Sequence, residues 1–403
     1  NCELKMKNWS LILSLVLFNS ALGNISDLED SLKNNKIIKL TSNNICSINS
    51  THLPINFFSK VYRGGKLEEN DKGSINNHNR INYSGFEFDL STGIKILNTK
   101  NSGWYITIQH LNTSGAKYPQ GLFNLVFVGN KGLEENLSIE KTKFHYRKHQ
   151  IIHLGLIKKN YNVGLSLGSI LNEYQGHFSQ DDEISLNSIY NWEINANPNV
   201  LVLQNTENTF IKNGNSIGID FQYRNEFSLK SNKKINYNIG IENFGLMSLH
   251  SNLDKYEIDT SFNFTGFSFN EITNIDTTLN NLSNNVSSKK NINKKEVLLN
   301  PFIFFGQLNY HLKNSNFIAG VFYRHNSQYI PKTYLGIQKN IKPFLNLGTN
   351  ISYGGYNQFQ LGALCNLKYQ KLNINLNLYN LFGVIPNFGK SFGFNLKIQW
   401  QIN

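Results

Sequence analysis

Two stretches near the C-terminus alternate apolar and polar residues almost without exception. The apolar positions fall on every second residue: Leu372, Ile374, Leu376 and Leu378 in the first stretch, then Phe392, Phe394, Leu396, Ile398 and Trp400 in the second. Asparagine, lysine and glutamine fill most of the positions between them. A period of two indicates a β-strand with one apolar and one polar face. The end of the chain is therefore predicted to form two amphipathic strands, the last of which ends close to an aromatic residue.

The same alternation recurs along much of the chain. It is found at Phe86–Leu90, Trp104–Ile108, Ile152–Leu156, Tyr161–Leu167, Ile217–Tyr223, Ile235–Ile241, Phe262–Phe269, Phe302–Tyr310, Phe317–Tyr323, Tyr334–Gln338 and Phe344–Tyr353. Lys158–Asn160 and Lys230–Lys233 are short polar connections, which predict tight hairpins. Residues 274–295 are rich in Asn, Ser, Thr and Lys and are predicted to form a long mobile loop. Residues 114–136 contain Gly and Pro and could hold a short helix or an inward-folded loop.

These strands predict an all-β fold, a single antiparallel transmembrane β-barrel with long polar extracellular loops. At roughly 10 residues per strand plus connections, the 380 residues after position 23 (403 minus 23) accommodate about 12 to 16 strands, and we expect about 14. A mean hydropathy of −0.36 excludes a bundle of membrane helices. It does not exclude a barrel, because only every second strand residue faces lipid. A secreted β-sandwich that binds glycans through exposed aromatic residues is the alternative fold.

The N-terminal segment has the features of an export signal. Lys7 supplies a positive charge, residues 11–18 are apolar apart from Ser14, and Ala21 and Gly23 are the small residues that precede a cleavage site. The apolar run is too short to cross a bilayer as a helix, which needs about 20 residues. We therefore expect residues 1–23 to be a leader, with the signal peptide at 6–23. Residues 24–59 are expected to form an irregular arm or plug, and residues 60–403 a barrel in the cell outer membrane.

The chain is basic, with a formal net charge of +12. Asn, Lys and Ile are all used heavily, as an AT-rich genome produces without selection for a ligand. A basic lumen that favours anions, or contact with anionic lipid headgroups, is the functional interpretation of the charge. The lysine-rich patches are short and carry no nucleic-acid-binding motif, so no nucleic-acid partner is expected.

Cys46 and Cys365 are the two cysteines that follow the expected leader. Two widely separated cysteines do not make a disulfide framework. A single bridge is compatible with an oxidising periplasm, but Cys365 lies within a strand pattern, which favours two free thiols.

Gly164–Gly168 matches the Gly-x-Ser-x-Gly pattern of the nucleophile elbow, with Ser166 at its centre. That motif requires a strand, a sharp turn and a helix in succession. Here it lies within continuous strand alternation, so an ordinary strand is the preferred interpretation. No catalytic residue is expected.

His145, His149 and His153 are spaced by four, which places them on one face of a strand, where a metal site is conceivable. No cysteine or carboxylate partner is evident nearby in the sequence, so lumen- or solvent-facing histidines are the simpler interpretation. The acidic residues 181–183 lack the spacing of a calcium-binding loop. We expect no metal and no cofactor.

Several segments together resemble a known family. They are Tyr118–Asn124 with Gly129–Asn130, Gly214–Tyr223, Phe264–Phe269, and the ending from Asn380–Pro386 to Phe392–Leu396. They resemble an uncharacterised outer-membrane β-barrel family of Bacteroidetes, similar to the PorP/SprF-like proteins associated with type IX secretion and gliding machinery. The resemblance covers most of the chain after the leader, and its motifs have no catalytic content. One departure is Asn243, where the family carries Asp.

The resemblance implies a non-enzymatic role as an accessory or anchor protein of a surface or secretion system. The expected partners are outer-membrane lipid and lipopolysaccharide, together with subunits of secretion or gliding machinery. A passive channel for small polar or anionic solutes is the alternative, since polar residues alternate along the strands. The enzyme-class rival is a barrel-embedded phospholipase that uses Ser166.

Overall fold

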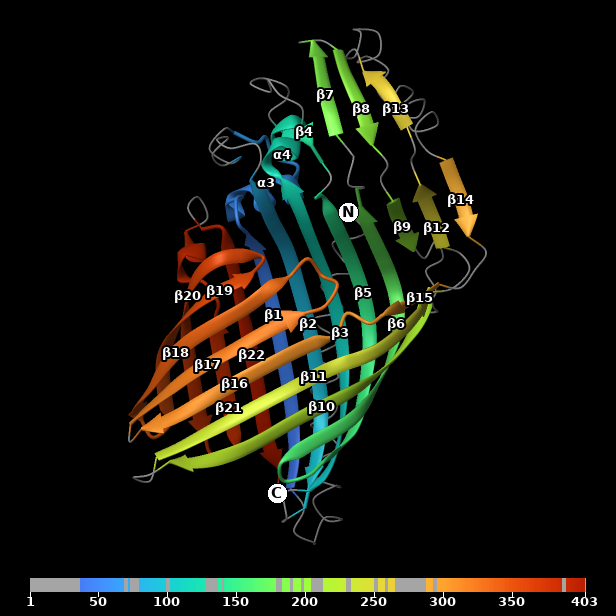
Figure 1. Ribbon diagram of the computed structural model, residues 1–403. Helices are drawn as coiled ribbons and strands as arrows, with labels where there is room; N and C mark the ends of the chain where they lie inside the picture. Colours follow the sequence, from blue (N-terminus) through green and yellow to red (C-terminus); the bar gives the residue numbers. More distant parts are fainter. Residues whose placement is uncertain are drawn as a thin grey trace.

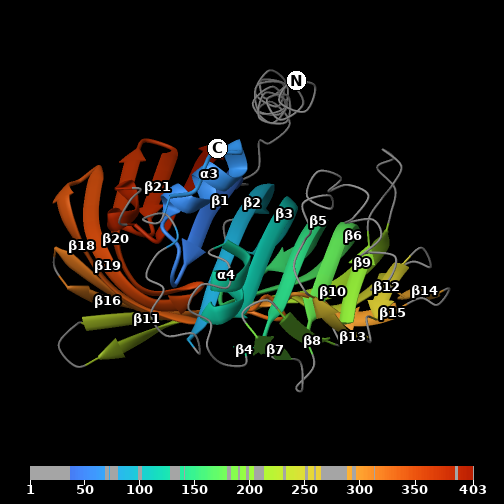
Figure 2. The same cartoon turned by 90° about the horizontal axis from the view of Figure 1, so that it is seen from above.

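The computed structural model shows a closed antiparallel β-barrel of 14 strands (Figures 1 and 2). The residues it describes are 37–68, 72, 80–98, 102–127, 137–139, 141–178, 183–188, 191–196, 199–203, 213–229, 233–249, 253–257, 260–264, 288–292, 296–312, 314–385 and 389–402. The expected leader, with its signal peptide at 6–23, lies outside the described residues. The predicted fold class and strand number are confirmed.

The barrel wall follows the order of the chain. Its strands are β1 (Ile37–Ser50), β2 (Ile81–Leu97), β3 (Gly103–Pro119), β5 (Lys143–Ile157), β6 (Tyr161–His177), β10 (Gly214–Leu229), β11 (Lys233–Leu249), β16 (Ile303–Leu312), β17 (Ser315–Arg324), β18 (Ile330–Lys342), β19 (Leu345–Gly355), β20 (Asn357–Tyr369), β21 (Leu372–Leu378) and β22 (Ser391–Ile402). Each strand pairs with its neighbour, and β1 pairs with both β2 and β22. That double pairing closes the cylinder, so the barrel has no free edge.

The two ends of the barrel differ (Figure 1). At one end, here called the loop end, lie the helices α3 (Ile55–Arg63) and α4 (Gln120–Phe127) and the long connections. A second small sheet stands there as well; it consists of β4 (Leu137–Ser138), β7 (Glu183–Ser188), β8 (Asn191–Ala196) and β13 (Thr260–Phe264). At the other end, the turn end, short hairpins such as 158–160 join consecutive strands. The tight hairpin predicted at 158–160 is confirmed at this end.

The wall is extended at the loop end by short strands. They are β9 (Asn199–Leu203), β12 (Leu253–Glu257), β14 (Ser288–Ile292) and β15 (Glu296–Leu299). The presence of β14 corrects the prediction that 274–295 is entirely loop, because its backbone pairs with β12 despite its polar composition. Residues 274–287 and 293–295 lie outside the described residues, as do Phe267, Phe269, Asp181 and Asp182. Of the two alternatives for 114–136, a short helix or an inward-folded loop, the structure shows the helix, α4.

The register of the last strands assigns their two faces. Leu376 of β21 pairs with Leu396 of β22, and Leu378 pairs with Phe394, whereas Asn377 pairs with Asn395. Both of these asparagines line a cavity inside the barrel. The apolar residues therefore face outward and the polar ones inward, as the alternation predicted. Exposed apolar side chains such as those of β5 and β6 continue this outer surface, which is suited to lipid.

The inward polar face and outward apolar face exclude the β-sandwich alternative, in which apolar faces would pack on each other. None of the helices among the described residues is long and apolar enough to cross a bilayer. Cys46 and Cys365 are both free thiols.

The N-terminal boundary of the barrel differs from the prediction. Residues 24–59 were expected to form an arm or plug, but Ile37–Ser50 is the first strand of the wall and α3 begins at Ile55. Residues 24–36 lie outside the described residues. The strand was missed because its outward face carries Ser42 and Asn44, which pair with Ile398 and Leu396 of β22. With polar residues on both faces, the apolar alternation disappears from the sequence while the backbone pairing remains.

Candidate functional site in the barrel lumen

A chain of hydrogen bonds runs around the inner wall across five strands. The side-chain nitrogen of Gln109 donates to Asp89 Oδ2 at 2.8 Å, and the side-chain oxygen of Gln109 lies 3.0 Å from His153 Nε2. His153 Nδ1 lies 2.6 Å from Asp220 Oδ2, and Asp220 Oδ1 accepts a hydrogen bond from the backbone N–H of Asn243 at 2.7 Å. The five residues belong to the wall strands β2, β3, β5, β10 and β11, so the register of the barrel assembles residues that are far apart in sequence. The network links the carboxylates of Asp89 on β2 and Asp220 on β10 through the Gln109 amide and the His153 imidazole.

The network ends at a bulge in β11. Asn243 has a left-handed backbone with φ of 58°, which asparagine tolerates better than most residues. Its side-chain oxygen accepts hydrogen bonds from Ser166 Oγ and from the amide of Asn300, both at 3.1 Å. Asn300 lies between β15 and β16, where the strand beside β11 is interrupted. An aspartate also has an acceptor oxygen at this position, so the departure from the resembled family preserves both bonds.

Buried ion pairs link the walls near the loop end. The Arg324 guanidinium at the end of β17 contacts the Glu87 carboxylate of β2 across the lumen. Arg147 of β5 pairs with Glu173 of β6 at 2.7 Å and also donates to the backbone carbonyl of Asn326. Except for Asn326, a turn residue that contributes only its carbonyl oxygen here, all these residues are buried. The β17–β18 turn is thus held against the opposite wall by charged groups.

A second inward turn joins this arrangement. Tyr356, between β19 and β20, donates its hydroxyl hydrogen to the carbonyl of Ser327 at 2.6 Å. Its ring occupies space left open by glycine on the opposite wall, because a Cβ on Gly85 would lie 2.3 Å from the ring and one on Gly115 would lie 2.7 Å from the hydroxyl oxygen. The ring of Tyr329 packs edge-on against that of Tyr356 at 5.1 Å. Two turns from one wall therefore reach β2 and β3 on the other.

We call residues 324–329 and 354–356, with the wall residues they contact, the lumenal cap. The expected plug of the barrel was the N-terminal segment 24–59. Among the described residues, the segments that cross the lumen are instead these two turns. No composition or periodicity signal marks them, since each turn is only a few residues long. The one available hint was the glycine pair Gly85 and Gly115, which lie opposite each other on the neighbouring strands β2 and β3.

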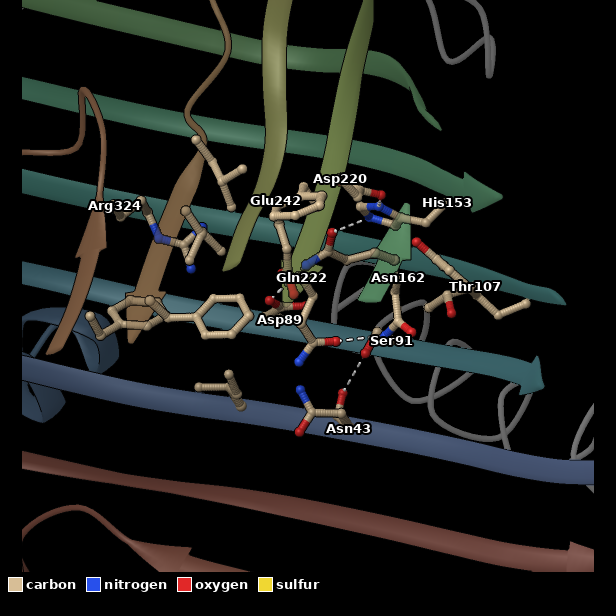
Figure 3. Close-up of a pocket in the computed structure, with 18 of the residues that line it drawn as sticks. Asn43, Asp89, Ser91, Thr107, His153, Asn162, Asp220, Gln222, Glu242 and Arg324 are labelled. Carbon is tan, nitrogen blue, oxygen red and sulfur yellow. Dashed lines mark hydrogen bonds and ion pairs between the residues drawn. The ribbon is translucent and has the colours of Figure 1, made fainter. Parts of the chain in front are cut away.

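Two cavities lie inside the barrel. Cavity A, of about 300 Å³, is lined by residues of β1, β2, β3, β5, β6, β10, β11, β16 and β17 (Figure 3). Cavity B, of about 330 Å³, is lined mainly by β16 to β22 together with β1 and β2. Ile45 and Phe322, from opposite walls, line both cavities. The lumen is therefore divided by side chains that approach from its two sides.

The charges that line these cavities are mixed. The carboxylates are Glu87, Asp89, Asp220 and Glu242, and the cations are Lys95, Arg324 and Lys332. The net positive charge of the chain is thus not gathered along the described lining of the lumen. This lining gives no support to an anion-selective pore.

The three histidines of β5 lie on one buried face, as their spacing predicted. His149 lies 3.2 Å from Glu173 and His153 pairs with Asp220, so carboxylate partners exist on other strands. Sequence proximity could not reveal these partners, because strand pairing brings them together. Among the described residues, no group of three or more His, Cys, Asp or Glu side chains could hold a metal ion.

The Gly164–Gly168 motif lies within continuous strand β6, not at a strand-to-helix turn. Ser166 is fully buried and donates to Asn243. Although His153 pairs with Ser166 in the β5–β6 ladder, its two ring nitrogens are directed to Asp220 and Gln109. The arrangement therefore lacks the serine–histidine hydrogen bond of a nucleophilic site.

A smaller polar cluster lies at the loop end, beyond the wall strands. The His52 ring lies 2.9 Å from the carbonyl of Lys72 and 3.0 Å from the amide of Gln120. Burial lowers the pKa of His52, and the carbonyl of Lys72 partly offsets this effect. Phe57 of α3 and Phe123 of α4 pack beside it, with ring centroids 5.6 Å apart. This cluster ties the two helices to the barrel rim.

An apolar outer wall around a polar lumen crossed by ion pairs and tyrosines defines a transmembrane β-barrel with a capped lumen. The particular family follows from the sequence: the model of a family of unknown function, DUF5723, matches residues 24–377, and the chain belongs to this family. No curated protein matches the chain.

Solved barrels have low similarity to this chain. The translocator domain of the autotransporter NalP from Neisseria meningitidis is 8% identical, with 97% of each chain covered and a TM-score of 0.32. A FadL homologue from Pseudomonas aeruginosa is 8% identical, with 91% of this chain and 90% of that chain covered and a TM-score of 0.38. The toluene transporter TodX from Pseudomonas putida is 8% identical, with 91% and 88% covered and a TM-score of 0.32. At these values the similarities carry no argument about function.

Proposed function

We propose that this protein is a non-enzymatic barrel of the outer membrane that acts as an anchor or accessory subunit of a surface or secretion assembly. Its loop end faces the cell exterior, because long connections are extracellular and short turns periplasmic in bacterial barrels. The protein reaches the membrane after cleavage of the expected signal peptide. The lumenal cap is the observation that carries the proposal.

The cap argues against a permanently open pore. Arg324 and Glu87 meet across the lumen, and Tyr356 of the same side reaches Gly85 and Gly115 of the facing wall. Separating a buried ion pair leaves each charge buried without its partner, which is strongly unfavourable. Arg324 and Glu87 are therefore expected to stay together and keep the lumen closed. A barrel whose lumen is closed by buried charged groups is better suited to anchoring an assembly than to passive diffusion of solutes.

The loop end supplies the surface for an assembly. Among the described residues, the helices α3 and α4 and the small sheet of β4, β7, β8 and β13 all stand at this end (Figure 1). The turn end offers only short hairpins in the described part. The proposed partners are therefore subunits that contact the loop end, with lipid and lipopolysaccharide around the wall.

Planar-bilayer recording of the purified full chain tests the closed lumen. The wild-type protein is expected to show no steady conductance, whereas a double variant Arg324→Ala/Glu87→Ala is expected to conduct because the crossing pair is removed. Leu376→Ala, on the outer face of β21, is the matched control and should remain silent. Steady conductance of the wild-type protein would overturn the proposal in favour of a passive channel for small polar solutes.

The assembly role needs its own test. Purification from native cells in mild detergent is expected to yield a stoichiometric complex with one or more surface or secretion subunits. Replacement of the β7–β8 hairpin by a short Gly-Ser turn should release them while the barrel still folds. A wild-type barrel that purifies alone, with unchanged surface secretion in cells that lack it, would reject the accessory role.

The absence of enzymatic activity is also part of the proposal. It is supported by the buried Ser166 hydroxyl, which is bonded to Asn243 and not to a histidine. Purified protein in mixed micelles is expected to release no fatty acid from phospholipid. Phospholipid hydrolysis by the wild-type protein that is lost in Ser166→Ala would show that the protein is an enzyme and overturn this part of the proposal.

A further inference from the structure

Cavity A contains two buried polar atoms that lack a partner among the described residues. Asp89 is 4% exposed; its Oδ2 accepts from Gln109, but its Oδ1 has no hydrogen-bond partner. Arg324 is 2% exposed; its Nη2 pairs with Glu87, but its Nη1 has none. Both side chains line the same cavity (Figure 3). The unpaired acceptor and the unpaired donor thus belong to two oppositely charged side chains that line the same cavity.

Such atoms are rarely left unpaired in native proteins. Buried donors and acceptors are nearly always hydrogen-bonded, either to protein or to an ordered molecule. The cavity of about 300 Å³ has room for far more than one water molecule, which takes up about 30 Å³ in the liquid. The two atoms can therefore be satisfied by a small organic ligand that spans them.

The remaining lining narrows the class of ligand. Glu242 and Asp220 add negative charge on the side of β10 and β11, and Tyr105 and Phe305 add aromatic surface. A simple anion would meet three carboxylates, and a simple cation would leave Arg324 Nη1 unsatisfied. We propose that cavity A binds a small zwitterion, an α-amino acid with an apolar side chain. Its ammonium group pairs with Asp89 Oδ1, its carboxylate pairs with Arg324 Nη1, and its side chain contacts the aromatic residues.

The lining of cavity A extends toward the turn end. Lys95, which lies two residues before β2 ends at Leu97, and Asn162, the second residue of β6, both belong to its lining. The lumenal cap lies toward the loop end of the same space. A ligand would therefore enter from the side of the short hairpins and stop beneath the cap. This ligand site shares Arg324 with the lumenal cap, but leucine binding and closure of the lumen are measured in separate experiments.

Calorimetric titration of the full chain in detergent micelles tests the proposal. Leucine is the probe, and N-acetyl-leucine and leucine amide are matched analogues that lack the ammonium and the carboxylate charge. We expect leucine to bind and each analogue to bind at least about tenfold more weakly, as the loss of one charged hydrogen bond predicts. Asp89→Asn should weaken leucine binding to the same degree and leave N-acetyl-leucine unchanged.

Glu226→Gln is the control variant, because Glu226 has an exposed side chain, pairs with Lys234 and lines neither cavity. It should bind leucine as the wild type does. Near-identical circular dichroism spectra and heat-modified gel migration of Asp89→Asn would show that it folds. Absence of leucine binding at millimolar concentration would mean that cavity A holds water only, and equal binding of N-acetyl-leucine would mean that Asp89 recognises no ammonium group. Either result overturns the proposal, while the bilayer experiment on the cap is unaffected by both.

Discussion

The outer face of β21 and β22 and the lumenal cap are built on opposite principles. On the outer face, each side chain is assigned by its place in a strict alternation, and Leu376 and Leu396 lie opposite each other because neighbouring strands pair in register. In the cap, Arg324 and Glu87 are separated by 237 positions in the chain. Tyr356 packs against Gly85 of the opposite wall, a contact that no local sequence pattern predicts.

The difference concerns what each region tolerates. An outward position requires only that the side chain be apolar, because lipid adapts its shape to the wall. A cap position requires a particular shape and charge, because each group is buried against a fixed partner. We expect substitutions in the two regions to separate accordingly.

The largest effect is expected in the cap. Arg324→Met leaves Glu87 as an unpaired buried charge, which costs about 3 to 5 kcal/mol of unfolding free energy. The double variant Arg324→Met/Glu87→Met removes both charges and should regain most of that loss. Urea unfolding in lipid vesicles, followed by tryptophan fluorescence, measures both. Equal destabilisation of the single and double variants would show that the ion pair is not what holds the cap.

In β21, the expected loss of stability depends on whether the substituted residue faces lipid or the lumen. Leu376→Arg places a charge near the middle of the lipid-facing wall and should cost about 2 to 4 kcal/mol. Asn375→Arg, on the inward face of the same strand, should be tolerated. The same vesicle unfolding assay compares them. If both variants were equally stable, the assignment of the two faces would be wrong.

A smaller loss of stability is expected when the hydroxyl group of Tyr356 in the lumenal cap is removed. Tyr356→Phe keeps the ring against Gly85 but removes the hydrogen bond to Ser327, and should cost about 1 to 2 kcal/mol. Tyr353→Phe is the control, because Tyr353 is exposed on the outer wall and should show no comparable loss. An unchanged free energy of unfolding in Tyr356→Phe would mean that ring packing alone positions the turn.

The smallest effect concerns pH at the loop end. Burial lowers the pKa of His52, so the folded state binds a proton less readily than the unfolded state, in which a histidine has a pKa of about 6.5. The attachment of α3 should therefore weaken as pH falls below that value. Hydrogen exchange of the α3 amides at acidic and neutral pH measures this, with His52→Gln as the control. Equal pH dependence in His52→Gln would assign the effect to another group.

Prediction from sequence succeeded where a local rule was sufficient. The hairpin at Lys158–Asn160 and the inward histidines of β5 follow from spacing alone. Strand β1 was missed because Ser42 and Asn44 interrupt its outward face, so periodicity could not distinguish it from an irregular arm. The carboxylate partners of His149 and His153 were missed for a different reason, since they lie on β6 and β10.

The sequence by itself determined that the chain is built of strands with one apolar and one polar face, because a period of two is maintained over many segments. The structure decided between a barrel and a β-sandwich. Only the tertiary structure decided what occupies the lumen. The closure of the barrel brings Arg324 to Glu87, Tyr356 to Gly85, and Asp89 to the cavity that Arg324 shares. The physical reason is that alternation states which face a residue occupies, whereas the contacts across the lumen depend on strand number, register and the inward path of two short turns.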